Sequence, residues 1–207
     1  VASGATLQVG NAGSVGALPP SAVVTNNGTL VISRSGSLTF ANSVNGSGDF
    51  VSRMAAGGTL TLRDDGAFTN TSAITLNYAT LAIDNNSNFR IQNNDRLPDA
   101  APITMRGGSL TLQGLAYQAA TETIGALTLA QGDNNITLSH AGGTFWSTDL
   151  TVASLTRSSG TTFNLTGNNQ GLPGNATHLY FTAAPTTVNR GLLGAWAIYN
   201  STDYLAY

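Results

Sequence analysis

A five-residue unit recurs along this chain: a small residue, then Thr, Ser or Ala, then Leu, any residue, and a second apolar residue. Repetition of this kind constrains the fold first, because each copy should become the same structural unit. The clear copies are ATLQV (5–9), GTLVI (28–32), GSLTF (36–40), GTLTL (58–62), ATLAI (79–83), GSLTL (108–112) and GALTL (125–129), and the looser ones are NITLS (135–139), DLTVA (149–153) and TFNLT (162–166).

Each unit has the pattern of a short β-strand. Its two apolar residues stand at i and i+2, so both leave the strand on one face while the residue between them leaves on the other. In GTLTL we therefore expect Leu60 and Leu62 to point inward, and Thr59 and Thr61 to point outward. Gly, Asn, Asp and Ser flank the units, and these residues favour turns.

The spacing of the units distinguishes two all-β architectures. The first Leu of successive units falls at positions 7, 30, 60 and 81, with a further strand at 38. Steps of roughly 20 to 25 residues are typical of the coils of a parallel β-helix, each with two or three short strands. An antiparallel sandwich is the alternative, because Asn-Gly or Asp-Gly turns occur at 27–28, 45–46 and 65–66. We predict the parallel β-helix, or β-solenoid.

Composition favours the same class, with little or no helix. Hydrophobic residues make up 41% and charged residues 9%, which describes a folded chain rather than a disordered polyelectrolyte. All eight basic residues are Arg, Lys is absent, and Glu122 is the only Glu, so the usual residues of exposed helix faces are missing. The chain has no Cys, which excludes disulfides and thiolate metal sites.

The charges and hydropathy of the chain also bear on its partners. The net charge is −2, and the scattered Arg residues form no basic stripe, so we expect no nucleic-acid partner. No apolar run is long enough to cross a bilayer as a helix, so we expect no membrane insertion of this segment. The whole chain, 1–207, is predicted to form one solenoid segment, with regular repeats over 1–92 and a more irregular, aromatic-rich region over 93–207.

The segment 5–62, ATLQVGNAGSVGALPPSAVVTNNGTLVISRSGSLTFANSVNGSGDFVSRMAAGGTLTL, resembles the autotransporter-associated β-strand repeat, also called the passenger-associated transport repeat. The shared features are the strand-and-turn blocks that end in GTLTL and the Gly-rich corners. Segments that accompany such repeats in long surface proteins are similar to NNDRLPDAAPITMRGGSLTLQG (93–114), TETIGALTLAQGDNNITL (121–138), LTVASLTRSSGTTFNLTG (150–167) and LLGAWAIYNSTDYLAY (192–207).

This resemblance implies a right-handed parallel β-helix that is exported from a bacterium and acts in adhesion, surface structure or presentation of other domains. It implies no catalytic residues and no cofactor. The chain lacks the signal peptide and the carboxy-terminal membrane barrel of a complete autotransporter, so we expect it to be part of a longer repetitive protein.

The adjacent carboxylates Asp64 and Asp65 are the first candidates for a site. Two carboxylates can act as general acid and base on a glycosidic bond. Adjacent strand residues point to opposite faces, however, and Arg63 and Gly66 make RDDG a turn sequence, so we predict a turn.

Calcium is a further alternative, because Asp65 lies about one coil before Asp84 and Asn85, and Asp95 and Asp99 stand in a polar loop. No calcium-binding repeat is present, and we predict instead that paired Asn residues form turn corners and amide ladders. These pairs are Asn26-Asn27, Asn85-Asn86, Asn93-Asn94, Asn134-Asn135 and Asn168-Asn169.

The remaining polar candidates carry weaker signals. His140 and His178 have no carboxylate at metal-ligand spacing and no obvious Asp partner, so we expect both to be exposed polar residues rather than zinc ligands or catalytic groups. An array of outward threonines can bind ice, and Thr59, Thr61, Thr111 and Thr128 occupy equivalent positions of their units. Thr also favours outward strand positions for its β-branch, which is the simpler interpretation.

Aromatic residues collect after residue 140, and we expect them to pack in the core or cap the end of the stack, with subunit or carbohydrate contacts as the alternative. They are Phe145, Trp146, Trp196, Tyr199, Tyr204 and Tyr207. An uncapped solenoid end exposes backbone donors and acceptors, so head-to-tail stacking into filaments is a further expectation. The sequence thus predicts a non-enzymatic structural segment of a secreted or surface protein, with a polysaccharide-binding or polysaccharide-cleaving β-helix as the alternative.

Overall fold

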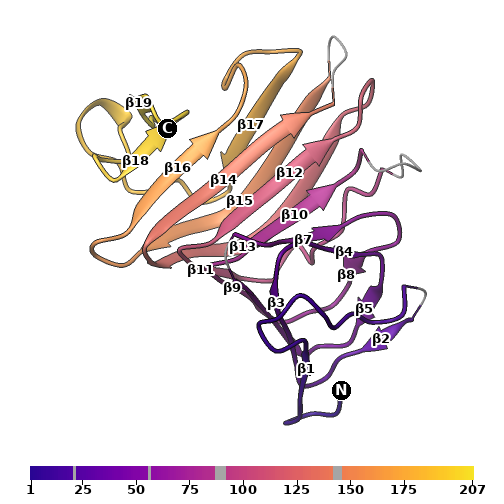
Figure 1. The fold of residues 1–207 in the computed structure, drawn as a ribbon. Helices are drawn as coiled ribbons and strands as arrows, with labels where there is room; N and C mark the ends of the chain where they lie inside the picture. Colours follow the sequence, from indigo (N-terminus) through magenta and orange to yellow (C-terminus); the bar gives the residue numbers. More distant parts are fainter. Residues whose placement is uncertain (21, 56, 87–91, 142–145) are drawn as a thin grey trace.

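A computed structural model describes residues 1–20, 22–55, 57–86, 92–141 and 146–207, and it folds them into a parallel β-solenoid (Figure 1). The all-β prediction is confirmed, since the helical content of the described residues is one short 3-10 turn, η1 (Asn189–Gly191). None of the described helical structure is long and apolar enough to span a membrane.

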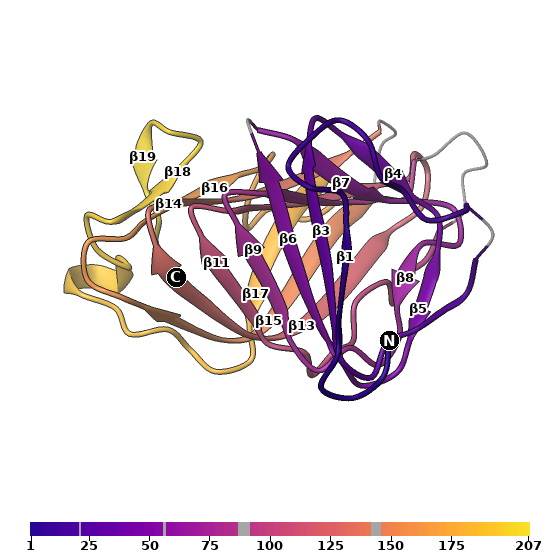
Figure 2. The same cartoon turned by 60° about the horizontal axis from the view of Figure 1, so that its bottom comes forward.

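Two eight-stranded sheets, here called sheet A and sheet C, run the length of the stack, and a three-stranded sheet B closes the amino-terminal coils. Figure 2 shows sheet A towards the viewer, with sheet C above it and sheet B at one side.

Sheet A consists of β1 (Thr6–Val9), β3 (Thr29–Ser35), β6 (Asp49–Ala55), β9 (Ile74–Asn77), β11 (Ile103–Arg106), β13 (Ala120–Gln131), β15 (Ser147–Arg157) and β17 (Ala176–Phe181). Sheet C consists of β4 (Leu38–Phe40), β7 (Thr59–Leu62), β10 (Thr80–Asp84), β12 (Ser109–Gly114), β14 (Asp133–His140), β16 (Thr162–Thr166), β18 (Ala197–Tyr199) and β19 (Asp203–Tyr204). Sheet B consists of β2 (Val24–Thr25), β5 (Ser43–Asn45) and β8 (Ala67–Phe68).

The repeat units are divided between the two long sheets, which corrects the single ladder expected from their spacing. Leu7 pairs with Leu30 in sheet A, whereas Leu60 pairs with Leu81 in sheet C, so the series 7, 30, 60 and 81 crosses from one sheet to the other. The cause is physical: both sheets need the same alternation of inward and outward residues, so both use the same five-residue unit.

Coil length follows from the strand register. In sheet A, Leu30 is followed one coil later by Phe50, and Phe50 by Ile74, so these coils have the predicted length of roughly 20 to 25 residues. The next coil runs from Ile74 to Ile103 and is longer. The predicted coil length therefore holds near the amino terminus, and longer corner segments extend some later coils.

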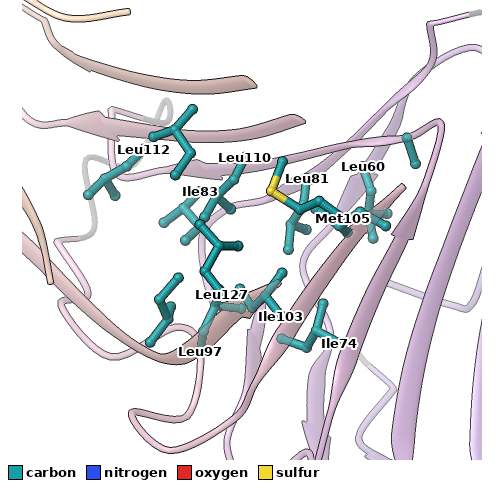
Figure 3. Close-up of a cluster of buried hydrophobic side chains, with 14 of the residues drawn as sticks. Leu60, Ile74, Leu81, Ile83, Leu97, Ile103, Met105, Leu110, Leu112 and Leu127 are labelled. Atoms are coloured by element: carbon teal, nitrogen blue, oxygen red, sulfur yellow. The ribbon is translucent and has the colours of Figure 1, made fainter. Parts of the chain in front are cut away.

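Apolar ladders from sheets A and C meet inside the stack and form its core (Figure 3). Leu60 and Leu62 are both fully buried, as the alternation predicts, while Thr59 and Thr61 are partly exposed. In sheet C the inward column of Leu60 continues through Leu81 and Leu110. Where sheet B closes the coils, Phe68 lies between Phe40 and Phe50, with ring centroids 6.0 and 4.4 Å apart.

Candidate functional site

The RDDG sequence forms a tight turn, as predicted. Asp64 and Asp65 occupy its two central positions, and the N–H of Gly66 donates to the carbonyl oxygen of Arg63 at 2.8 Å. Asp64 has a left-handed backbone, with φ of 54°, which Asp tolerates in turns. A Cβ on Gly66 would overlap the carbonyl oxygen of Phe40 in the preceding coil, so this position requires glycine. The turn therefore closes a corner of the solenoid.

The same turn is the docking point of a buried arginine that the sequence did not single out. Arg96 is fully buried, and its Nη1 donates to the carbonyl oxygens of Asp64 and Gly66 at 2.9 and 2.6 Å. Its Nε donates to Oδ1 of Asn85 at 2.9 Å. One guanidinium thus joins the RDDG corner to the next coil, and a buried charge of this kind is tolerated because its donors meet acceptors.

Glu122, the only Glu of the chain, lies against the backbone of Arg96. It is 1% exposed, and its two carboxylate oxygens accept the backbone N–H groups of Arg96 and Leu97 at 3.1 and 3.3 Å. Burial raises the pKa of Glu122 to about 8, against the opposing effects of these two hydrogen bonds and of the Arg96 charge. The absence of Glu from the rest of the chain is the one sequence signal that could have marked this position.

Two of the residues suggested as calcium ligands, Asp84 and Asn85, are bonded within the protein. Oδ2 of Asp84 accepts from Nη2 of Arg63 at 2.5 Å, and Oδ1 of Asp84 accepts the N–H of Asn86 at 2.8 Å. The amide oxygen of Asn85 is taken by Arg96. Within the described parts of the chain, no three His, Cys, Asp or Glu residues gather as metal ligands would. The guanidinium groups of Arg63 and Arg96 thus bond the side-chain oxygens of Asp84 and Asn85 that a cation would use.

Asparagines link successive coils and form the predicted amide ladder, but Asn134 and Asn135 lie in β14 and not at the turn corner that the sequence predicts for them. Asn26 is buried, and its Nδ2 donates to the carbonyl oxygen of Asp49 one coil later at 3.0 Å. Asn135 and Asn164 are register partners, and their amides form a ladder step of 3.4 Å. Asn134 is bonded in several directions. Its Oδ1 accepts the N–H groups of Gly107 and Gly108, and its Nδ2 faces the carbonyl oxygens of Gln131, Gly132 and Thr162.

We expect Asn134→Leu to lower the free energy of unfolding by about 2 to 3 kcal/mol, because it removes hydrogen bonds that a buried amide makes to backbone groups of three successive coils. Urea denaturation followed by circular dichroism measures this change. The matched control is Asn70→Leu, at an exposed loop position, which should change stability by less than about 0.5 kcal/mol. Equal effects of the two substitutions would contradict this role of Asn134.

His178 has an Asp partner, which corrects the expectation of an exposed histidine without one. The register of β15 and β17 places His178 beside Asp149, and Nδ1 lies 2.6 Å from Oδ1 of Asp149. The other ring nitrogen, Nε2, lies 3.0 Å from the carbonyl oxygen of Leu172. Ser147 donates to Asp149 at 2.9 Å and not to the histidine, so this is not the arrangement of a nucleophilic triad. The group ties loop 167–175 to sheet A.

Loop 167–175 covers the carboxy-terminal edge of sheet A. The N–H of Thr177 donates to the carbonyl oxygen of Asn168 at 2.8 Å, and the N–H of Leu179 donates to Oε1 of Gln170 at 3.4 Å. We expect His178→Phe to speed amide exchange at Leu179, because the ring bond to Leu172 is lost while the stacking on Tyr180 is kept. Exchange measured by NMR at Leu30, inside the stack, is the reference and should not change.

The four outward threonines do not form one array. Thr61 and Thr111 share a column of sheet C, with Ala82 between them, and Thr59 lies in the adjacent column of that sheet. Thr128 lies on sheet A, where its hydroxyl bonds that of Thr156 at 3.0 Å. The reason is again that the same five-residue unit forms strands in both sheet A and sheet C.

The aromatic residues divide into two groups. Trp196 and Tyr199 pack against the core at the carboxy-terminal end, which agrees with the expectation that the aromatic residues pack in the core or cap the end of the stack. Trp146, Tyr204 and Tyr207 are exposed, and Phe145 lies outside the described residues. In sheet C the end is closed by β19, which pairs antiparallel with β18, whereas β18 pairs parallel with β16.

Chemically, the polar clusters described above act as structural connections between coils. His140, the other histidine, is half-buried at the end of β14, where it pairs in register with Gly114.

No protein-family model matches the chain, and searches of curated proteins and of solved structures likewise find no match.

Proposed function

We propose that this chain is a non-enzymatic structural segment of a bacterial surface or extracellular protein. It would serve as a stalk, as the scaffold of an adhesin passenger domain, or as a building block of a fibre. The observation that carries the proposal is the continuous parallel stack, in which buried polar groups such as Arg96 and Asn134 connect one coil to the next. The resemblance of residues 5–62 to autotransporter-associated repeats supports the same role.

The ends of the stack bear on self-association. Loop 167–175 covers the last strand of sheet A, and β19 ends sheet C with an antiparallel pair. An antiparallel pair gives this part of sheet C a strand direction that differs from that of the parallel coils. We propose that the segment associates with itself, head to tail or side by side, and sedimentation velocity over a range of concentrations measures this association.

Labelling of intact cells tests the proposed role. Antibodies raised against this segment should label unpermeabilised cells of the producing bacterium, or react with its culture medium, and external protease should remove the label. Labelling that required permeabilisation would contradict a surface or extracellular location. Electron microscopy of the full-length protein should show an elongated rod, and a compact particle would contradict a stalk.

A polysaccharide-binding or polysaccharide-cleaving β-helix is the second candidate. One observation favours its binding form, namely a hollow beside Trp196 that is lined by polar side chains such as Asp133 and Asn135. The cleaving form would depend on the carboxylates of Asp64 and Asp65, and both residues lie in the turn that closes a corner of the solenoid. Depolymerising activity that was lost in an Asp64→Asn, Asp65→Asn double variant would favour the cleaving form over the structural role.

A further inference from the structure

The indole of Trp196 borders two neighbouring hollows near the carboxy-terminal end of the stack. One, here called the Trp196 hollow, has a volume of about 360 Å³ and lies over the first residues of β14, β16 and β18, which run side by side in Figure 1. Its polar lining consists of the buried Asn134 and of Asp133, Asn135, Thr162, Asn164 and Ser201. The second hollow, of about 420 Å³, includes Arg157. A concave site of this size with a few convergent polar groups is typical of small-ligand binding.

The strand register sets the polar lining of the Trp196 hollow. Asp133 pairs with Thr162 and Asn135 pairs with Asn164, so four polar side chains alternate with the buried Asn134 and Phe163 and leave the sheet on its outer face. The hydroxyl of Thr162 donates to Oδ1 of Asp133. These contacts fix the side chains before a ligand arrives.

The polar groups of the hollow keep free hydrogen-bonding capacity. The amide nitrogen of Asn164 donates to Oδ1 of Asn135 at 3.4 Å, and its amide oxygen accepts the N–H of Ser201 at 3.0 Å. An amide has two N–H donors and a carboxylate has acceptors on both oxygens, so Asn135 and Asp133 can both bind a further partner. The hollow therefore offers a donor from Asn135 and an acceptor from Asp133.

The charges around Trp196 define the class of ligand. Among the described residues that line the Trp196 hollow, Asp133 supplies the charge, and it disfavours an acidic ligand. Arg157 lies over the indole with its guanidinium carbon 4.8 Å from the ring centroid, and this cation–π contact holds the ring in place. A neutral sugar ring matches this lining, because its hydroxyls both donate and accept while its C–H groups pack against an aromatic ring.

We propose that the Trp196 hollow binds a neutral sugar unit of a polysaccharide. This site would give the proposed scaffold a ligand of its own. The structural role does not depend on it, because a stalk without a sugar site remains a stalk.

Tryptophan fluorescence tests the proposal, because the chain has two Trp residues. In a Trp146→Phe background Trp196 is the sole indole, and its emission reports on the hollow. The probes are the neutral tetrasaccharides cellotetraose, laminaritetraose and mannotetraose, with tetragalacturonate as the acidic comparison. We expect at least one neutral tetrasaccharide to shift the emission with a dissociation constant of about 1 mM, the scale for a ligand of which one sugar ring is buried.

Variants of the lining separate this site from any other. Asp133→Ala and Asn135→Ala, each in the Trp146→Phe background, should weaken binding at least about fivefold. The matched control is Ser109→Ala, in the same column as Asn135 but one coil away and outside the hollow, and it should bind as the parent does. Thermal melts of all variants show whether folding is retained. The proposal is wrong if no neutral tetrasaccharide binds, if tetragalacturonate alone binds, or if folded lining variants bind as well as the control.

Discussion

Arg96→Met should lower the free energy of unfolding by about 3 to 5 kcal/mol, because it removes a charged donor from several buried acceptors at about 1.5 to 3 kcal/mol for each charged hydrogen bond. Methionine fills a similar volume but donates no hydrogen bond. The carbonyl oxygens of Asp64 and Gly66 would lose the donor that Arg96 provides, and the amide oxygen of Asn85 would keep only the N–H of Asn93. Glu122 would lose the positive charge beside it. Urea denaturation followed by circular dichroism measures the loss.

Arg53→Met is the control for the Arg96 substitution. Arg53 lies on β6 with an exposed side chain, so its replacement should change stability by less than about 0.5 kcal/mol. The comparison holds the chemical change constant and varies only the surroundings. If the two variants were equally stable, the Arg96 cluster would not be a structural connection, and the interpretation of the RDDG corner would have to be abandoned.

The strand pattern could be predicted from sequence because it is local. The burial of Leu60 and Leu62 follows from an i, i+2 alternation within one repeat unit, and the turn at Asp64 and Asp65 follows from the RDDG sequence alone. The assignment of units to sheets could not be predicted in this way. The alternation specifies an inward face but does not say which sheet provides it, so Thr128 and Thr61 occupy equivalent positions of their units although they lie on different sheets.

The polar connections could not be predicted because their partners lie about one coil or more apart. Arg96 meets the carbonyl oxygen of Asp64 across 32 residues, and His178 meets Asp149 across 29. Coil length varies along the stack, so the partner of a given residue is known only once the register is known. The rarity of Glu made Glu122 visible as an exception, but its burial beside Arg96 depends on that register.

The stability of the wild-type protein should depend on pH through Glu122. Its pKa is about 8 in the folded protein and near its ordinary 4.5 when the chain is unfolded, so the folded state holds a proton that the unfolded state has released. The stability that this proton provides is fully present below about pH 4.5 and is lost as the pH rises to about 8. Across that window Glu122 alone should lower the free energy of unfolding by a few kcal/mol, at about 1.4 kcal/mol per pKa unit.

Glu122→Gln should remove this pH dependence. Glutamine resembles the protonated carboxyl group and does not titrate, so unfolding free energies measured between about pH 5 and 8 should fall less steeply in the variant than in the wild type. The variant should also be less stable than the wild type at about pH 5, because the side-chain N–H₂ replaces an oxygen that accepts from Arg96 or Leu97. The stability difference between the two proteins should therefore narrow as the pH rises.

Two further variants make the assignment to Glu122 specific. Asp99→Asn neutralises an exposed carboxylate, and its free energy of unfolding should change with pH as that of the wild type does. Arg96→Met removes the positive charge that favours ionised Glu122, so the pKa of Glu122 should rise and the decline in stability should continue to higher pH than in the wild type. If the free energy of unfolding fell equally steeply with pH in the wild type and in Glu122→Gln, other groups would titrate in this range. The buried carboxyl group would then have to be ionised already at the acidic end of this range, held so by Arg96 and the two backbone N–H groups.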